Sequence, residues 1–240
     1  MTKRIDNDIY KPEFVKDLFN KMSHTYERMN YITSFGFSIR WRRQSLDFFK
    51  KTEKEVEVLD LMCGMGETWD FIINRFPNAS ITAADFSTEM LKKAETKNQK
   101  KFGGKVELIN EDFLKNNLPS NYYDYVICAY GLKTFDEEQL NFLAAEVNRI
   151  LKPNGYFSFI EVSKPENPFL KMSYQFYLKN VIPILGRLFL GNPEQYKMLW
   201  HYTENFENAN QSYHIFLKNG LQANYIKYFY GCASGIFGTK

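Results

Sequence analysis

Two glycines and one acid are spaced along this chain in a pattern that can hold a nucleoside. Gly64 and Gly66 follow the apolar run Val56–Leu61, and Asp85 ends a second apolar run that begins at Ser80. Glycines let backbone N–H groups approach a ligand with no Cβ in the way. An acid at the end of the next strand can accept hydrogen bonds from both hydroxyl groups of a ribose. The spacing therefore predicts a strand, a glycine turn and a ribose-binding acid.

The residue after this turn narrows the choice of ligand. A dinucleotide fingerprint would place a third glycine where Trp69 stands, so the sequence disfavours a pyrophosphate on the helix N-terminus. An adenosyl ligand without phosphates remains, and S-adenosylmethionine fits. We expect Gly64, Met65 and Gly66 to lie at its amino-acid end and Asp85 at its ribose.

Two acids have both a ligand-binding and an ordinary structural interpretation. Asp112 follows the apolar run Val106–Asn110 and could accept a hydrogen bond from the adenine amino group, but an acid there is also a common turn residue. Asp85 could bind the ribose or could be the N-cap of a helix that starts near Ser87. The glycines upstream favour the ribose role for Asp85, whereas the two interpretations of Asp112 stay balanced.

The composition predicts one domain with an insertion and excludes some partners. A chain of 240 residues can bury one substantial core. The 31 basic and 28 acidic residues give a net charge of +3, which is too balanced to indicate nucleic acid. Cys63, Cys128 and Cys232 lie far apart without a metal-binding spacing, which favours a reducing, cytoplasmic location and no metal. We expect no secretory signal and no integral membrane segment, since the longest apolar run, Val181–Leu190, is interrupted and shorter than the about 20 residues that a span needs.

Strand and helix signals alternate from Val56 to Val162, as in a doubly wound, mostly parallel sheet with helices on both faces. Ser87 and Asp136 are expected N-caps, and Gly103 and the segment Lys152–Gly155 are expected helix ends. The expected strands are 56–61, 80–84, 106–110, 123–129 and 156–162, and the expected helices are 67–76, 87–101, 137–151 and 207–219.

Two segments fall outside this alternation, and both are rich in aromatic residues. Residues 1–50 are expected to form a helical N-terminal lid, and residues 165–205 a helical insertion that is a substrate lid, a dimer surface or a membrane-facing patch. Residues 51–164 would be the cofactor-binding core, and residues 206–240 its last helix and strands. In α/β sheets ligands bind at the carboxyl ends of the strands, where both extra segments would lie.

With these motifs placed, the chain resembles the class I S-adenosylmethionine-dependent methyltransferases, and more narrowly the ubiquinone/menaquinone-biosynthesis C-methyltransferases of the UbiE type. The resemblance covers nearly the whole chain. The segments that carry it are Tyr26–Asn30, Ser34–Gly36, Trp41–Arg43, Leu59–Glu67, Ala84–Ser87, Glu89–Leu91, Ala129–Thr134, Arg149–Gly155, Glu161–Pro165 and Val181–Gly186.

The resemblance implies a Rossmann-like sheet of seven strands and S-adenosylmethionine as cofactor. It extends the expected cofactor contacts to residues inside the matched segments and beside Asp112, namely Asp60, Phe86, Phe113, Ala129 and Tyr130. It also implies a small, largely apolar aromatic acceptor such as a quinol or phenol. Partners beyond that acceptor are not implied, although a homodimer and a peripheral membrane contact stay open.

Carbon methylation of a phenol needs a base, or a cation that stabilises the phenolate and so makes the ring nucleophilic. Lys133, after the fourth strand, could be that cation, or it could be a solvated lysine before the cap Asp136. His201 in the insertion is a second titratable candidate. Tyr26 could hydrogen-bond the acceptor or could simply pack in the lid.

Departures from the family pattern leave two alternatives open. Lys133 and Thr134 replace an arginine and an asparagine of the family motif, and Ser38 and Ile236 stand where the family has histidines. One alternative is therefore a methyltransferase of a specialised phenolic or polyketide-type metabolite, with C-, O- or N-methylation. The other is a non-catalytic protein that binds the cofactor or a partner.

Overall fold

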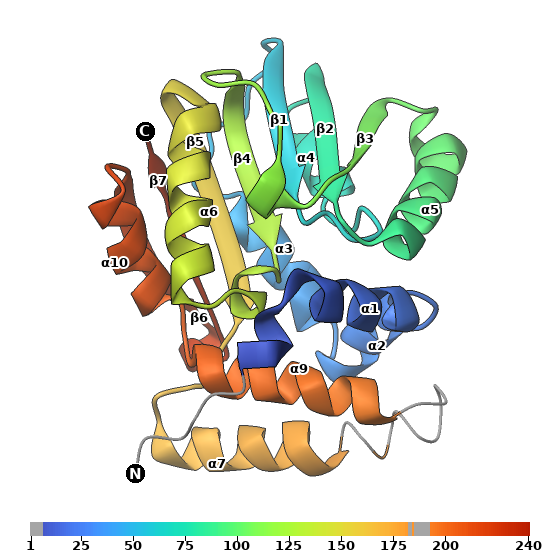
Figure 1. Cartoon of the computed structure of the whole chain (residues 1–240), viewed down its shortest axis with the longest axis vertical. Helices are drawn as coiled ribbons and strands as arrows, with labels where there is room; N and C mark the ends of the chain where they lie inside the picture. The colour runs from blue at the N-terminus through green and yellow to red at the C-terminus, as the bar shows by residue number, and fades with distance from the viewer. Residues whose placement is uncertain (1–6, 182–183, 185–192) are drawn as a thin grey trace.

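A computed structural model describes residues 7–181, 184 and 193–240 of the chain, and a seven-stranded sheet lies at its centre (Figure 1). The strands are β1 (Val56–Leu61), β2 (Ala79–Asp85), β3 (Val106–Asn110), β4 (Tyr123–Ala129), β5 (Leu151–Val162), β6 (Gln222–Tyr228) and β7 (Ala233–Thr239). The helices are α1 (Pro12–Met22), α2 (Tyr26–Thr33), α3 (Phe37–Ser45), α4 (Trp69–Arg75), α5 (Thr88–Lys97), α6 (Glu137–Ile150), α7 (Pro168–Phe176), α9 (Pro193–Phe206) and α10 (Asn210–Lys218).

The strand order places the glycine turn at the point where the chain reverses direction across the sheet. The order is β3-β2-β1-β4-β5-β7-β6, and β7 is antiparallel to its neighbours β5 and β6. The other neighbouring pairs are parallel, so β1 lies between β2 and β4 with Leu61 beside Ala84 and Asp60 beside Ile127. The carboxyl ends of β1, β2, β4 and β5 therefore lie together at one edge. Ligands bind at such a reversal in open α/β sheets.

Each central strand buries side chains on both faces, because helices cover the sheet from both sides. Leu59 and Val126 face the cluster formed with α6 and α10, whereas Val58 and Ile127 face the cluster formed with α4 and α5. Successive residues of a strand point to opposite faces, and here both faces are covered. The strands are therefore mostly apolar instead of alternating between apolar and polar residues. The predicted fold class, a doubly wound α/β sheet of the class I methyltransferase type, is confirmed.

The N-terminal helices and the insertion meet below the carboxyl ends of the parallel strands, where Figure 1 shows α1, α2, α7 and α9. Asn20 of α1 accepts a hydrogen bond from the Ser87 hydroxyl at 2.7 Å, which ties α1 to the start of α5. The buried Tyr202 of α9 donates to the carbonyl oxygen of Ile9. Residues 182–183 and 185–192 of the expected insertion, and residues 1–6 of the expected lid, lie outside the described residues. The lid role itself stays a prediction.

The caps and most strands lie where the sequence predicts them. The Ser87 side chain accepts from the backbone N–H of Met90, and Asp136 forms a capping box with Gln139. The predicted start of the fifth strand is wrong, because β5 begins at Leu151 rather than Tyr156. The expected turn at 152–155 is instead an irregular part of this strand, with a register shift against β4 and a positive φ of 64° at Asn154.

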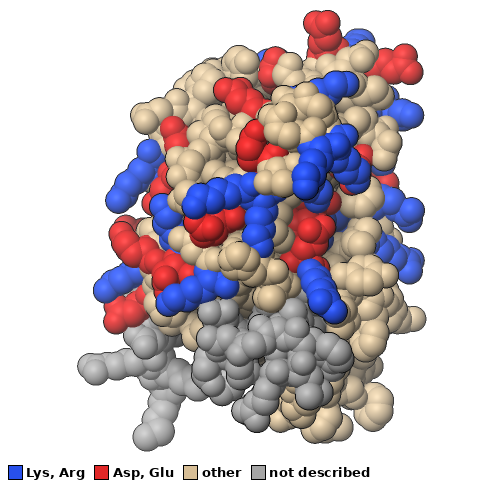
Figure 2. Space-filling model, turned by 90° about the vertical axis from the view of Figure 1, so that its right-hand side faces the viewer, with Lys and Arg blue, Asp and Glu red and all other residues tan. Residues whose placement is uncertain are grey.

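No helix within the described residues is long and apolar enough to cross a membrane. Figure 2 shows the α5 side of the molecule, where lysines and arginines alternate with aspartates and glutamates over the upper part. Four lysines on α1, on α5 and just after α5 form ion pairs, for example Lys101 with Asp70 at 2.6 Å and Lys92 with Glu89 at 2.6 Å. This face therefore carries mixed charge and no uniform basic surface of the kind that binds nucleic acid.

Candidate active site

Two cavities meet at the carboxyl edge of the sheet. The first is lined by the loop after β1, the end of β2, the segment after β3 and the inner side of α1. The second is lined by α2, α3, α7, α9 and the ends of β4 and β5. Tyr26 and Tyr130 line both cavities and so stand between them. We call them the turn cavity and the aromatic cavity.

The glycine turn has the backbone that the sequence predicts. Gly64 and Gly66 have φ angles of +58° and +77°, a region that side chains with a Cβ rarely adopt. A Cβ on Gly66 would also lie 2.6 Å from the ring of Trp69, which is fully buried beneath the turn. The indole therefore fills the space that a third glycine would leave open, which explains why the dinucleotide pattern stops after two glycines.

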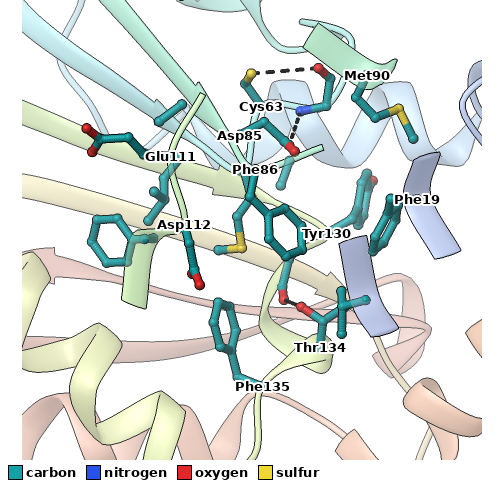
Figure 3. A pocket seen from close by; sticks show the side chains of 18 of the residues that line it. Phe19, Cys63, Asp85, Phe86, Met90, Glu111, Asp112, Tyr130, Thr134 and Phe135 are labelled. Atoms are coloured by element: carbon teal, nitrogen blue, oxygen red, sulfur yellow. Dashed lines mark hydrogen bonds between the residues drawn. The ribbon is translucent and has the colours of Figure 1, made fainter. Parts of the chain in front are cut away.

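Asp85 holds the turn and lines the turn cavity (Figure 3). Its Oδ2 accepts from the backbone N–H of Gly64 at 2.9 Å and its Oδ1 from that of Ser87 at 2.8 Å. The N-cap of α5 is Ser87, so the alternative in which Asp85 is only a helix cap does not match the geometry. Burial raises the pKa of Asp85 to about 6, although the hydrogen bonds from Ser87 and Gly64 oppose that rise.

The turn cavity extends between the end of β2 and the segment after β3, where the sequence predicts the adenine. Phe86, Asp112 and Phe113 line it, and the carboxylate of Asp112 is seen among them in Figure 3. Oδ1 of Asp112 accepts from the backbone N–H of Leu114 at 3.0 Å and starts a short 3₁₀ helix, so the turn role is real. That bond occupies one oxygen, and the adenine contact stays a prediction.

Two buried acids beneath the turn have carboxylate oxygens without hydrogen-bond partners among the described residues, namely Oδ2 of Asp60 and Oε1 of Glu67. Oε2 of Glu67 accepts from the backbone N–H of Met65 at 3.2 Å, and Oε1 lies 3.6 Å from the guanidinium of Arg42. Burial, with the Glu67 carboxylate nearby, raises the pKa of Asp60 to about 8. Of the two acids, Glu67 lines the turn cavity, so its Oε1 suits a ligand with an ammonium group, whereas Asp60 lies outside the lining.

The expected cofactor residues divide into those that line the turn cavity and those that support its lining. Glu67 also lines the turn cavity, although the sequence indicated it only as the last residue of the segment Leu59–Glu67 and gave it no contact of its own. The lining residues that the sequence predicts are Gly64, Asp85, Phe86, Asp112, Phe113, Ala129 and Tyr130, whereas Asp60, Met65 and Gly66 lie next to it in the chain and do not line it.

The aromatic cavity contains Lys133 and is otherwise lined by apolar, aromatic and uncharged polar side chains, such as Phe37, Trp41 and Tyr174. The interpretation of Lys133 as a solvated lysine is wrong, because this side chain is buried and its ammonium lies 2.6 Å from Oε1 of Glu161. His201 is exposed on α9 and lines neither cavity. The structure therefore brings Tyr26 and Lys133 together and leaves His201 apart.

Two charged residues that sequence reasoning left without a role complete the site. Arg42 of α3 places its guanidinium 4.6 Å from the ring centre of Tyr130, and Glu161 pairs with Lys133. A signal for Glu161 exists, because it is an acid at the end of an otherwise apolar strand. Burial holds the pKa values of the Tyr26 and Tyr130 phenols well above their ordinary range, so both hydroxyls are neutral near pH 7.

Comparison with known proteins decides what this arrangement is. Residues 6–240 match the model of the ubiE/COQ5 methyltransferase family. The chain belongs to this family. Relatives named demethylmenaquinone methyltransferase include one from Listeria welshimeri, 30% identical over 96% of this chain and 97% of that protein. Another, from Lactococcus lactis subsp. lactis, is 31% identical over 95% and 90%. The protein is thus an S-adenosylmethionine-dependent methyltransferase.

Solved structures confirm the fold of the methyltransferase at low sequence identity. A putative S-adenosylmethionine-dependent methyltransferase from Methanococcus maripaludis is 16% identical, has a TM-score of 0.62 and covers 94% of this chain and 93% of its own. The geranyl diphosphate C-methyltransferase of Streptomyces coelicolor, solved with S-adenosyl-L-homocysteine, is 12% identical with a TM-score of 0.56, covering 84% and 76%.

Replacing Asp85 with alanine should weaken the binding of S-adenosylhomocysteine by about 1.5–3 kcal/mol, the range for losing hydrogen bonds to a charged group. Calorimetric titration measures this loss. The matched control is Ser87→Ala, which removes the cap of α5 and should lower the stability by about 1 kcal/mol with little change in affinity. Equal affinity in Asp85→Ala and the wild-type protein would contradict the ribose role.

The affinity for S-adenosylhomocysteine should also fall as the pH decreases through about 6. The carboxylate of Asp85 is charged above its pKa of about 6 and neutral below it, and the charged form is the better acceptor for two hydroxyl groups. Each further pH unit should then weaken binding by up to about tenfold. Titrations between pH 5 and 7.5 test this, with Asp85→Asn as a variant in which this component is absent.

Proposed function

We propose that this methyltransferase methylates a quinol, of the benzoquinol or naphthoquinol kind, that binds in the aromatic cavity. The observation that carries the proposal is the meeting of the two cavities at Tyr26 and Tyr130, with Lys133 in the aromatic one. A ring bound there has apolar walls on its faces and one ammonium for an oxygen. The name of the relatives, demethylmenaquinone methyltransferase, supports a quinone-type acceptor.

The residues of the turn cavity fit the cofactor, which supplies a methyl group on a positively charged sulfur. The Glu67 oxygen that lacks a donor lies at the end of the cavity that would take the ammonium of its amino-acid part. Asp85 would face the ribose, and Asp112 with Phe113 would face the adenine, because all three line the turn cavity. The protein then contributes alignment and the exclusion of water, because methyl transfer is an in-line displacement with little further chemistry for side chains to do.

Lys133 is the group we assign to the acceptor oxygen. A quinol ring carbon becomes nucleophilic when its hydroxyl loses a proton to solvent, and an ammonium beside that oxygen favours the loss because it stabilises the phenolate. Tyr26 and Tyr130 stay neutral at working pH, so their hydroxyls act as hydrogen-bonding or packing groups rather than as bases. Tyr130 already donates to the carbonyl oxygen of Ser38 at 2.8 Å, which fixes its ring between the cavities.

Two alternatives remain as competing proposals. A specialised phenolic or polyketide-type acceptor is favoured by Lys133 and Thr134 in place of the family's arginine and asparagine. Both are buried, Lys133 at the aromatic cavity and Thr134 at the turn cavity. The other alternative, a non-catalytic protein that binds the cofactor or a partner, is disfavoured because the chain belongs to a methyltransferase family.

We also propose a cytoplasmic location and a contact through apolar surface, made either with a membrane or with a second copy. Phe169, Met172 and Phe176 share an exposed face of α7, while Leu170 and Tyr174 on its inner side line the aromatic cavity. The buried, unpaired cysteines fit a reducing compartment. A protein that is monomeric by light scattering and does not sediment with lipid vesicles would exclude both contacts.

The proposed function predicts turnover with quinols. Labelled S-adenosylmethionine should transfer its methyl group to reduced naphthoquinols or benzoquinols faster than to simple phenols, amines or polyketide-type phenols. Mass spectrometry of the product locates the methyl group on carbon, oxygen or nitrogen. Transfer to oxygen or nitrogen of a different acceptor class would favour the specialised-metabolite alternative, and cofactor binding without any turnover would favour the non-catalytic one.

Lys133→Ala should lower the turnover number by about a hundredfold or more, because it removes a charge that stabilises the transition state. Cofactor affinity should change little, since Lys133 does not line the turn cavity. Lys133→Arg should keep part of the activity, because the positive charge remains while the donor geometry differs. Wild-type turnover in Lys133→Ala would rule out the phenolate role.

A further inference from the structure

Glu161 and Lys133 form a buried ion pair at the carboxyl ends of two neighbouring strands. Glu161 is the next-to-last residue of β5. Lys133 follows β4, in the short 3₁₀ helix Leu132–Thr134. The ammonium and Oε1 are 2.6 Å apart, and the two side chains are 6% and 0% exposed. Water therefore screens this pair very little.

The backbone holds the Glu161 carboxylate in place. Oε1 also accepts from the backbone N–H of Val162 at 2.7 Å, and Oε2 accepts from that of Lys133 at 3.3 Å. Three donors thus fix two oxygens, so the carboxylate cannot turn without breaking hydrogen bonds in a buried place. The position of the Lys133 ammonium is set by the sheet through this carboxylate.

The two members of the pair face different surroundings. Lys133 lines the aromatic cavity, whereas Glu161 is fully buried behind it and lines neither cavity. Among the described residues, the Lys133 ammonium has Glu161 as its hydrogen-bond partner. An ammonium has three N–H groups, so two are left for an oxygen in the cavity.

Stability alone explains such a pair poorly. Removing two charges from water costs several kcal/mol per ion, and well-packed apolar residues often stabilise a fold as well as a buried pair does. A buried charged donor with free N–H groups, held at the wall of a cavity, is instead what stabilisation of a developing negative charge requires.

We propose that Glu161 is a positioning residue for methyl transfer, which holds the Lys133 ammonium with its remaining N–H groups toward the acceptor oxygen. This inference rests on the proposed quinol acceptor and on the role of Lys133 there. The carboxylate keeps the cation in the buried wall before the acceptor binds. The ammonium then meets the oxygen without having to reorganise.

Two single variants test the position and the charge separately. Glu161→Asp keeps the charge but withdraws it by one methylene, and Glu161→Gln keeps the shape but removes the charge. Both should lower the turnover number at least about tenfold, with the KM for the quinol and the affinity for S-adenosylhomocysteine within about twofold. The double variant Glu161→Gln with Lys133→Met should have the same turnover number as Lys133→Met alone, because both changes remove the same function.

A second, partly exposed ion pair on the same two strands provides a control. Lys152 and Asp124 lie near the amino-terminal ends of β5 and β4, with a distance of 2.7 Å between ammonium and carboxylate. Neither residue lines a cavity. Asp124→Asn should change the turnover number by less than about twofold. A loss as large as that of Glu161→Gln would show that any broken ion pair in this sheet lowers activity, and would overturn the inference.

A charge reversal separates a functional pair from a structural one. Lys133→Glu with Glu161→Lys restores opposite charges but turns the carboxylate toward the cavity, so turnover should stay at the level of Lys133→Met while thermal stability partly recovers. Recovery of turnover with stability would overturn the positioning role. If this variant does not fold, binding of 4-nitrophenol decides. The phenolate absorbance should be larger with wild-type protein than with Glu161→Asp, and equal absorbance would overturn the inference.

These measurements also distinguish the positioning role of Glu161 from the proposed role of Lys133 on which it rests. Wild-type turnover in Lys133→Met would mean that the proposed role of Lys133 is wrong, whatever Glu161 does. A large loss in Lys133→Met with wild-type turnover in both Glu161 variants would leave the function intact and reject the positioning role alone.

Discussion

The hydrogen bond from the backbone N–H of Gly64 to the Asp85 carboxylate is the interaction on which the site depends. It joins the loop after β1 to the end of β2 at 2.9 Å, and so fixes the floor of the turn cavity. Burial makes this carboxylate expensive to keep charged, and the two backbone donors offset part of that expense. The positive φ angles of Gly64 and Gly66 follow from the same contact, because the loop must bend back toward Asp85 to make it.

The sequence predicts well those features that depend on local pattern. The strands at 106–110 and 123–129, the Ser87 and Asp136 caps and the glycine turn were all expected and are present. The start of β5 was not, since Pro153 and Gly155 read as a turn, and pairing with β4 outweighs this local signal. The antiparallel place of β7 between β5 and β6 is likewise set by contacts distant in sequence.

Charged partners in the site are the part that sequence alone does not reveal. Lys133 and Glu161 are 28 residues apart, and Arg42 and Glu67 come from a helix and a loop that no periodicity connects. Each residue taken singly has a plain interpretation as a solvated charge. Burial together with a partner changes that interpretation, and both depend on how the N-terminal helices and the strand ends assemble. The same reasoning explains why His201 looked suitable and yet lies in solvent.

Tyr130 lies between the two cavities, and neighbouring residues hold both its backbone and its side chain. Tyr130 has a φ of 72°, which is unfavourable for a side chain of its size, and it is held there by its hydrogen bonds to Ser38 and Ile160 and by the Arg42 guanidinium over its ring. Because this ring lines both cavities, a donor and an acceptor bound in them would both contact it. Any change in affinity that one ligand causes for the other through this ring would then be equal in both directions, by thermodynamic reciprocity.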